Sequence, residues 1–133
     1  MILGIDHIGL AVSDIEAASV TFSRLLGEEA ASVEQLAAQQ VRLCFVPNAA
    51  PNLELLEPLA PESATGRFLA KRGEGMHHVC FAVDDIEVEL TRLHDAGFEL
   101  IDRVARRGHG GLVAFVHPRA AHGVLVELLQ RDP

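Results

Sequence analysis

Two histidines and two glutamates stand at matching places in the two halves of this chain. His7 lies in the run DHIGLAV (residues 6–12), and His78 lies 71 residues later in GMHHVCFAV (residues 75–83). Glu54 in LELL and Glu127 in VELL are separated by 73 residues. Two imidazoles and two carboxylates suit a first-row divalent cation, and protein ligands that leave positions open for a substrate are typical of a catalytic site. The repeat therefore predicts one metal site formed by these four residues.

Each of these residues, taken singly, has a more ordinary explanation. A lone strand histidine is more often a satisfied core or edge residue, and a lone strand glutamate more often faces solvent. The same residue types recur at the same places in a second copy, and this internal repetition favours the metal site. His77 must point away from His78 because strand side chains alternate, so we expect a structural role for it. His94 and His122 are expected at the surface.

The elements that must position the four residues repeat a β-α-β-β-β pattern. Apolar patterning and turn residues predict strands at 3–12, 28–37, 41–46 and 52–57 in the first copy, and at 76–83, 98–101, 112–116 and 123–129 in the second. Helices are expected at about 15–26, where Ser13 and Glu16 have capping-box spacing, and at about 86–96. Pro47-Asn48 and Ala50-Pro51 mark a turn, and residues 106–111 a glycine-rich loop.

These elements predict an α+β fold for a single domain over residues 1–133. The first copy covers about 1–58, a linker with a short helix covers about 59–74, and the second copy covers about 75–133. A chain of this length buries enough apolar surface for one compact core.

Composition excludes several classes of partner. The net charge of −8 argues against nucleic acid, which requires a basic face. No apolar run reaches the roughly 18–20 residues of a membrane span, and the first residues read as a strand rather than a basic leader, so we expect a cytoplasmic protein. Residues 1–66 hold nine acidic and two basic residues, whereas residues 67–133 hold ten acidic and nine basic ones. The second half is therefore better suited to meet an anionic small molecule.

The chain resembles the vicinal oxygen chelate superfamily and, within it, the methylmalonyl-CoA epimerase family. The run DHIGLAV is common to the superfamily, whereas GMHH (75–78), LELLEPL (53–59) and HP (117–118) followed by GVLVEL (123–128) are similar to the epimerases. The resemblance covers nearly the whole chain. It implies two βαβββ modules that form a cupped half-barrel sheet around a metal site, and it implies a homodimer. His7, Glu54, His78 and Glu127 match the family's ligand positions.

The activity implied by the resemblance is metal-dependent interconversion of the C2 epimers of methylmalonyl-CoA. Removal of the C2 proton, which lies between a carboxylate and a thioester, gives an enolate that a divalent cation stabilises. Cobalt or manganese is the ion favoured, and nickel or zinc also accepts these ligands. Ser63 and Arg119 lie in segments that match the family and are candidate substrate contacts, as is His109 in the glycine-rich loop. Basic residues that are candidates for the CoA phosphates, although each is more often a solvated surface charge, are Arg67, Lys71, Arg72, Arg106, Arg107 and Arg119.

One departure from the family bears on the acid/base groups. Some epimerases of this type carry a glutamate on the third strand and a glutamine as the strand ligand of the first module. Residues 41–45 (VRLCF) offer no acid here, and the ligand position is Glu54. We therefore expect Glu54 and Glu127 to act as the two acid/base groups from opposite faces of C2.

Two alternative functions differ in what they require. A glyoxalase I-type lyase would use the same ligand order and also move a proton through an enolate-like intermediate. A metal-free small-molecule binding protein of the same fold would need an aromatic cleft, and this chain has six Phe, no Trp and no Tyr. The four filled ligand positions favour an enzyme.

Overall fold

The computed structural model describes residues 1–48 and 51–133, so Ala50 of the expected turn lies outside the described residues. The chain forms two compact units. Module one consists of residues 7–77, and module two consists of residues 1–6 together with 78–133. The α+β class and the two βαβββ units are confirmed. Among the described helices, none has the length and apolar character needed to cross a membrane.

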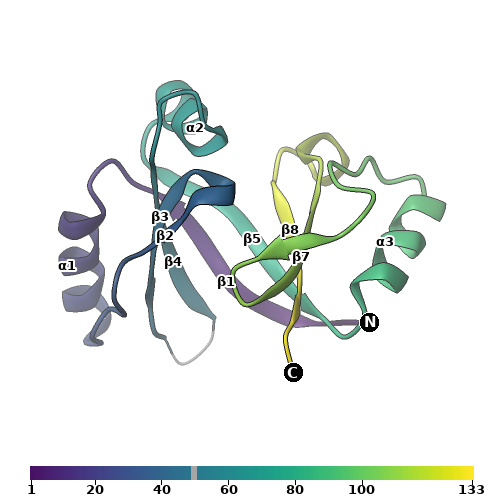
Figure 1. Ribbon diagram of the computed structural model, residues 1–133, viewed down its shortest axis with the longest axis horizontal. Coiled ribbons are helices and arrows are strands. Elements are labelled where there is room, and N and C mark those ends of the chain that lie inside the picture. The colour runs from purple at the N-terminus through teal and green to yellow at the C-terminus, as the bar shows by residue number, and fades with distance from the viewer. Residues whose placement is uncertain (49–50) are drawn as a thin grey trace. The chain divides into compact units, whose positions relative to one another are not determined.

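Module one is a mixed sheet with one long helix packed against it (Figure 1). Its strands lie in the order β2-β3-β4-β1; β3 is antiparallel to β2 and β4, and β4 is parallel to β1. Its elements are β1 (Ile2–Ala11), which begins in module two, α1 (Ile15–Leu26), β2 (Glu34–Leu36), the 3-10 turn η1 (Ala37–Gln39), β3 (Val41–Val46), β4 (Asn52–Pro58) and α2 (Ala64–Arg72). The expected helix in the linker is confirmed as α2.

The apolar stripe of α1 determines which face of this sheet is covered. Ile15 packs with Cys44, Val46 and Leu55, and Phe22 lies against the same cluster. Because strand side chains alternate, residues one position away on each strand point to the other face. That second face carries the candidate ligands.

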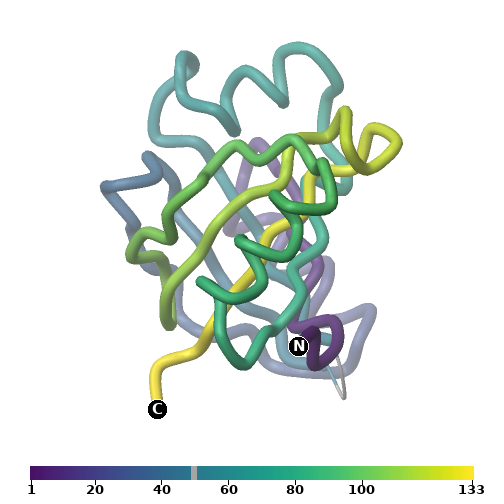
Figure 2. Tube along the Cα trace, turned by 90° about the vertical axis from the view of Figure 1, so that its right-hand side faces the viewer, coloured from purple at the N-terminus to yellow at the C-terminus, as the bar shows by residue number. Residues whose placement is uncertain are grey.

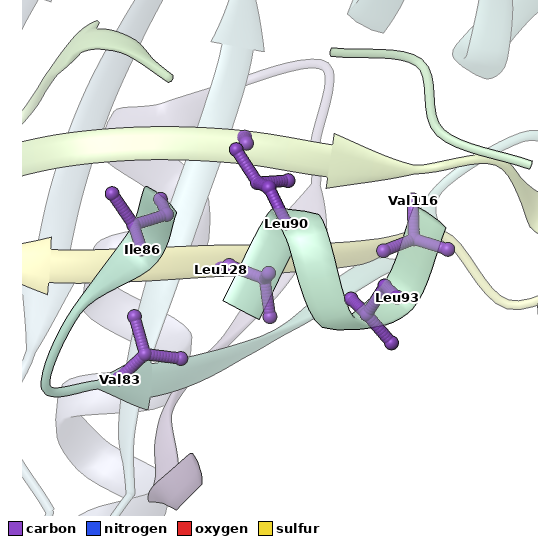
Figure 3. Close-up of a cluster of buried hydrophobic side chains, with 7 residues drawn as sticks. Val83, Ile86, Leu90, Leu93, Val116 and Leu128 are labelled. Atoms are coloured by element: carbon purple, nitrogen blue, oxygen red, sulfur yellow. The ribbon is translucent and has the colours of Figure 1, made fainter. Parts of the chain in front are cut away.

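Module two repeats the arrangement with the strand order β5-β8-β7-β6. Its elements are β5 (Gly75–Val83), which begins in module one, α3 (Ile86–Asp95), β6 (Arg106–Gly108), β7 (Gly111–Val116), the 3-10 turn η2 (Pro118–Ala121) and β8 (Val126–Arg131). Figure 3 shows Leu90 and Leu93 of α3 gathered with Val116 and Leu128 of the sheet. Residues 1–6 belong to this module, and the N-terminus lies against its other segments in Figure 2. The Met1 carbonyl accepts a hydrogen bond from the Asp84 N–H.

The two long helices begin in the same way. Asp14 accepts a hydrogen bond from the Ala17 N–H at 3.0 Å, and Asp85 accepts one from the Val88 N–H at 3.1 Å. These N-caps satisfy backbone donors that have no partner within the helix. The expected capping box at Ser13 is wrong, because the Ser13 hydroxyl and N–H both donate to Glu74.

Three predicted strands differ from the structure. The expected strand at 28–37 is reduced to β2, and the last strand begins at Val126 rather than 123. Residues 98–101 form only an isolated bridge between Leu100 and Val116. The Asp102 carboxylate accepts the Phe115 N–H at 2.8 Å and so takes a hydrogen bond that a neighbouring strand would have used. The glycine-rich segment forms the β6–β7 hairpin instead of an open loop.

Candidate metal centre

The register of two parallel strands brings His7 and Glu54 together in module one. Glu54 of β4 lies opposite Gly9 of β1, and Asn52 lies opposite His7. His7 and Glu54 therefore occupy neighbouring rows on one face of the sheet, the face that α1 does not cover. The His7 Nε2 atom lies 3.5 Å from Glu54 Oε1, and the two residues are only 4% and 7% exposed.

Module two contains the same arrangement. Glu127 of β8 lies opposite Cys80 of β5, one row along from His78. The His78 Nε2 atom lies 3.3 Å from Glu127 Oε1, and both side chains are buried. Each module thus supplies one imidazole nitrogen and one carboxylate oxygen to its own face.

These distances fit two ligands of one cation. Two donor atoms that each lie about 2.1 Å from an ion, at about 90–110° to each other, are about 3.0–3.4 Å apart. The separations of 3.5 Å in module one and 3.3 Å in module two lie close to or within this range. Mixed nitrogen and oxygen donors suit the first-row divalent cations, so the chemistry of the donor set also fits a metal.

An aromatic ring lies beside each candidate histidine. Phe45 is opposite Glu54 in the β3–β4 register and meets the His7 ring edge to face at 5.7 Å. Phe115 is opposite Glu127 and meets the His78 ring at 6.1 Å. The rings restrict the orientations of the imidazoles and exclude water from one side of them. Sequence analysis missed this pair, although the two phenylalanines recur 70 residues apart.

A further carboxylate on the same face of module one was also missed. Glu34 of β2 lies opposite Leu43 of β3, two residues before Phe45. Directly opposed residues share a face, so Glu34 lies on the face that carries His7 and Glu54. The sequence signal was weak, because only the hairpin register fixes the face of so short a strand.

The three candidate substrate contacts lie elsewhere in their modules. Ser63 is the buried N-cap of α2; its hydroxyl donates to Ala60 O at 2.7 Å and accepts from the Gly66 N–H at 3.0 Å. His109 lies at the turn between β6 and β7. These placements leave the substrate-binding assignments as predictions.

Arg119, the third candidate, is exposed and held by Glu99. Its guanidinium donates two hydrogen bonds to the Glu99 carboxylate, at 3.2 and 2.7 Å. Arg119, with a smaller contribution from His117, lowers the pKa of Glu99. This ion pair must open or turn before Arg119 can meet a substrate anion.

His77 and Cys44 contact neighbouring residues of the fold, whereas two further histidines are exposed. His77 meets Phe68 of α2 edge to face at 4.9 Å, and His94 and His122 are the exposed pair. The Cys44 thiol donates to Ala31 O at 3.1 Å, and burial raises its pKa. Cys44 therefore stays protonated at neutral pH, as expected for a buried structural thiol.

Comparison with known proteins identifies the family. Residues 6–115 match the model of the glyoxalase/bleomycin resistance protein/dioxygenase superfamily. The chain belongs to this superfamily. The family predicted from the sequence motifs is thereby confirmed.

Several similar proteins within the superfamily are named methylmalonyl-CoA epimerases. The ethylmalonyl-CoA/methylmalonyl-CoA epimerase of Cereibacter sphaeroides is 35% identical over 133 residues, covering 98% of this chain and 99% of the relative. The crystal structure of methylmalonyl-CoA epimerase from Mycobacterium tuberculosis matches with a TM-score of 0.93 at 33% identity, covering 99% of this chain and 90% of that one. A methylmalonyl-CoA epimerase solved with methylmalonyl-CoA and ammonium matches with a TM-score of 0.91 at 33% identity over the full length of both chains.

Proposed function

We propose that this protein is a methylmalonyl-CoA epimerase. The observation that carries the proposal is the buried His–Glu pair on one face of each module, in a chain that matches epimerases from end to end. Epimerisation at C2 requires acid/base groups on both sides of one carbon. A fold that presents the same residue types twice supplies such a pair of groups.

The finer part of the proposal is that His7, Glu54, His78 and Glu127 hold one divalent cation. Cobalt or manganese is favoured, and nickel or zinc is compatible with the same ligands. A cation bound there supplies positive charge that stabilises the enolate oxygen. The spacing of the donor atoms within each module supports this assignment, and two ligands alone would leave each half of the site incomplete.

The carboxylates of Glu54 and Glu127 are proposed to move the proton. One carboxylate oxygen takes the C2 proton, and the C–H electron pair passes into the enolate. The carboxylic acid on the opposite side then donates a proton to C2, which inverts the centre without any redox change. Glu34 is the competing candidate for the module-one role because it lies on the same face of the sheet as Glu54.

Proton NMR of methylmalonyl-CoA in deuterated buffer tests the activity. We expect loss of the C2 proton signal with the purified protein, suppression by EDTA, and recovery on addition of cobalt or manganese. Epimerisation is scored separately with a stereospecific mutase. Absence of exchange with every one of these metals would remove the epimerase proposal, and the glutathione–methylglyoxal adduct would then test the glyoxalase I alternative. Inactivity on both substrates would favour the metal-free binding protein.

Two glutamate variants separate the proton-transfer roles. Glu54→Gln keeps an oxygen ligand, so we expect it to retain most metal but to lose more than about 100-fold in turnover, the usual range for removing a general acid or base. Glu34→Gln is the matched variant on the same face, and it should remain active. Near-normal epimerisation by Glu54→Gln together with an inactive Glu34→Gln would transfer the role to Glu34.

Assembly and location form the last part of the proposal. We propose a cytoplasmic homodimer with an acyl-CoA as its small-molecule partner, and without a nucleic-acid or membrane partner. Light scattering coupled to size-exclusion chromatography measures the mass of the assembly in solution, and a monomer would contradict the dimer.

A further inference from the structure

The short edge strands of the two modules carry opposite charges at equivalent positions. Glu34 of β2 lies opposite Leu43, two residues before Phe45. Arg106 of β6 lies opposite Val113, two residues before Phe115. Because directly opposed residues share a face, Arg106 lies on the ligand face of module two, as Glu34 does in module one.

Phe115 contacts both the Arg106 guanidinium and the ring of the candidate ligand His78. The central carbon of the guanidinium is 5.5 Å from the centroid of the Phe115 ring, which meets the His78 ring edge to face at 6.1 Å. A cation over an aromatic face is held in place by the ring quadrupole. One phenyl ring therefore separates a fixed positive charge from a proposed metal ligand.

Asp102 fixes the direction of this side chain. Its Oδ1 atom accepts a hydrogen bond from Arg106 Nε at 3.2 Å, and its Oδ2 atom accepts the Phe115 N–H at 2.8 Å. The same carboxylate thus holds both the arginine and the strand that carries the ring. No hydrogen bond to a described residue involves the two terminal amino groups of Arg106.

The neighbouring arginines differ in this respect. Arg107 lies on the other face of β6, and its Nη1 donates to both oxygens of Asp132, at 2.7 and 2.8 Å. Arg119 forms a bidentate ion pair with Glu99, and Arg131 forms one with Asp6. Arg106 is thus anchored through Nε, whereas these three arginines use terminal amino groups in ion pairs.

We propose that Arg106 binds an anionic group of the acyl-CoA substrate. The inference rests on the proposed function and names a specificity-determining residue for it. A guanidinium fork matches carboxylate and phosphate oxygens in two parallel hydrogen bonds. In a chain of net charge −8, a fixed cation beside the reacting centre also offsets repulsion of an anionic substrate. The anion is either the free carboxylate of the acyl group or a phosphate of coenzyme A.

Steady-state kinetics of Arg106→Gln, Arg106→Lys and Arg103→Gln test the assignment, with methylmalonyl-CoA and with methylmalonyl-pantetheine, which lacks the phosphates. We expect Arg106→Gln to raise KM at least tenfold, Arg106→Lys to recover part of the loss, and the control Arg103→Gln, which removes an exposed arginine of the same module, to stay within twofold of wild type. A rise for both thioesters identifies the acyl carboxylate as the anion. A rise for the CoA thioester alone identifies a phosphate.

Equilibrium titration with malonyl-CoA separates this inference from the epimerase proposal. If wild type binds malonyl-CoA without epimerising methylmalonyl-CoA, and Arg106→Gln weakens that binding at least tenfold, Arg106 keeps its role while the activity fails. A folded Arg106→Gln that matches wild type in both KM and malonyl-CoA affinity overturns the assignment. Equal loss in Arg103→Gln also overturns it, because a general charge effect would then explain the result.

Discussion

The two modules share a frame and differ at its edge. Each places a histidine on its first strand, a phenylalanine on its third and a glutamate on its last, with a similar His–Glu separation. The short edge strand then carries Glu34 in one module and Arg106 in the other. A reaction that removes a proton from either side of one carbon needs matched groups on both sides. Its substrate is not symmetric, so groups that recognise the carboxylate and the thioester need not match.

The helices show the same mixture of identity and divergence. The first helical N–H donates to a side chain of the last strand in both modules, Ile15 to Glu57 and Ile86 to Gln130. Glu57 also pairs with Arg42, whereas the neutral Gln130 makes no ion pair. The hydrogen bond that fixes the helix is retained while the charge around it changes.

The largest expected effect tests whether His7 and His78 contribute equally to one metal site. If all four residues bind one ion, His7→Ala and His78→Ala should each release the metal and reduce C2 exchange by more than about 100-fold. Even mutation of a residue that only hydrogen-bonds a metal ligand lowers metal affinity or activity by about 10–100-fold. Metal analysis after dialysis measures ions per chain, and circular dichroism checks that each variant is folded. A variant that keeps one of two bound ions would mean that each module has a site of its own.

A second prediction sharpens the comparison at the start of β3 and β7. Gly111 of module two stands where module one has Val41, in the corresponding strand position. A Cβ at Gly111 would overlap Gln130 O and lie 2.9 Å from Arg131 Cα, and neither backbone atom can move freely. We expect Gly111→Ala to lower the free energy of unfolding by about 3 kcal/mol or more, measured by urea denaturation.

Gly123→Ala is the control for that substitution. Gly123 has φ +88° and open space around its Cβ position, so only backbone strain opposes a side chain there. The expected loss is about 1–2 kcal/mol. Equal losses in the two variants would show that the close approach at Gly111 has relaxed.

The smallest predicted effect is a difference between α1 and α3 in how their stability depends on pH. Glu89 of α3 is 3% exposed, and the guanidinium of Arg92, followed by the Met1 ammonium, lowers its pKa. The corresponding residue of α1 is Ala18. A lowered folded-state pKa gives stability that is present above the unfolded pKa and is lost as pH falls through the folded value. Protonation of Glu89 should therefore weaken α3 as the pH falls.

Glu89→Gln tests this assignment. The variant should lose about 1 kcal/mol at pH 7, the scale of a net hydrogen bond, and its stability should depend less on pH below about 4.5. Hydrogen exchange resolved by residue locates the loss in α3 or elsewhere. An unchanged pH profile would exclude Glu89 as the acid-sensitive group.

Much of the frame was predictable because it depends on local patterns. Gly27 ends α1 in the left-handed conformation at φ 68°, as a glycine after an apolar stripe predicts. The strands 41–46 and 52–57 were predictable from β-branched and apolar runs bounded by proline. The strand at 98–101 was not, because the side chain of Asp102 takes the backbone hydrogen bond of Phe115 and so ends the pairing.

The sequence by itself predicted the residue types of the candidate site, since repetition can be detected without coordinates. His7, Glu54, His78 and Glu127 were predicted as ligands from the internal repeat and from the family resemblance. Only the tertiary structure decided which further groups share their faces. Face membership depends on strand register, and a shift of one residue reverses it. Phe45, Glu34 and Arg106 could therefore be placed on the faces of the candidate ligands only once β3 was paired with β4, β2 with β3, and β6 with β7.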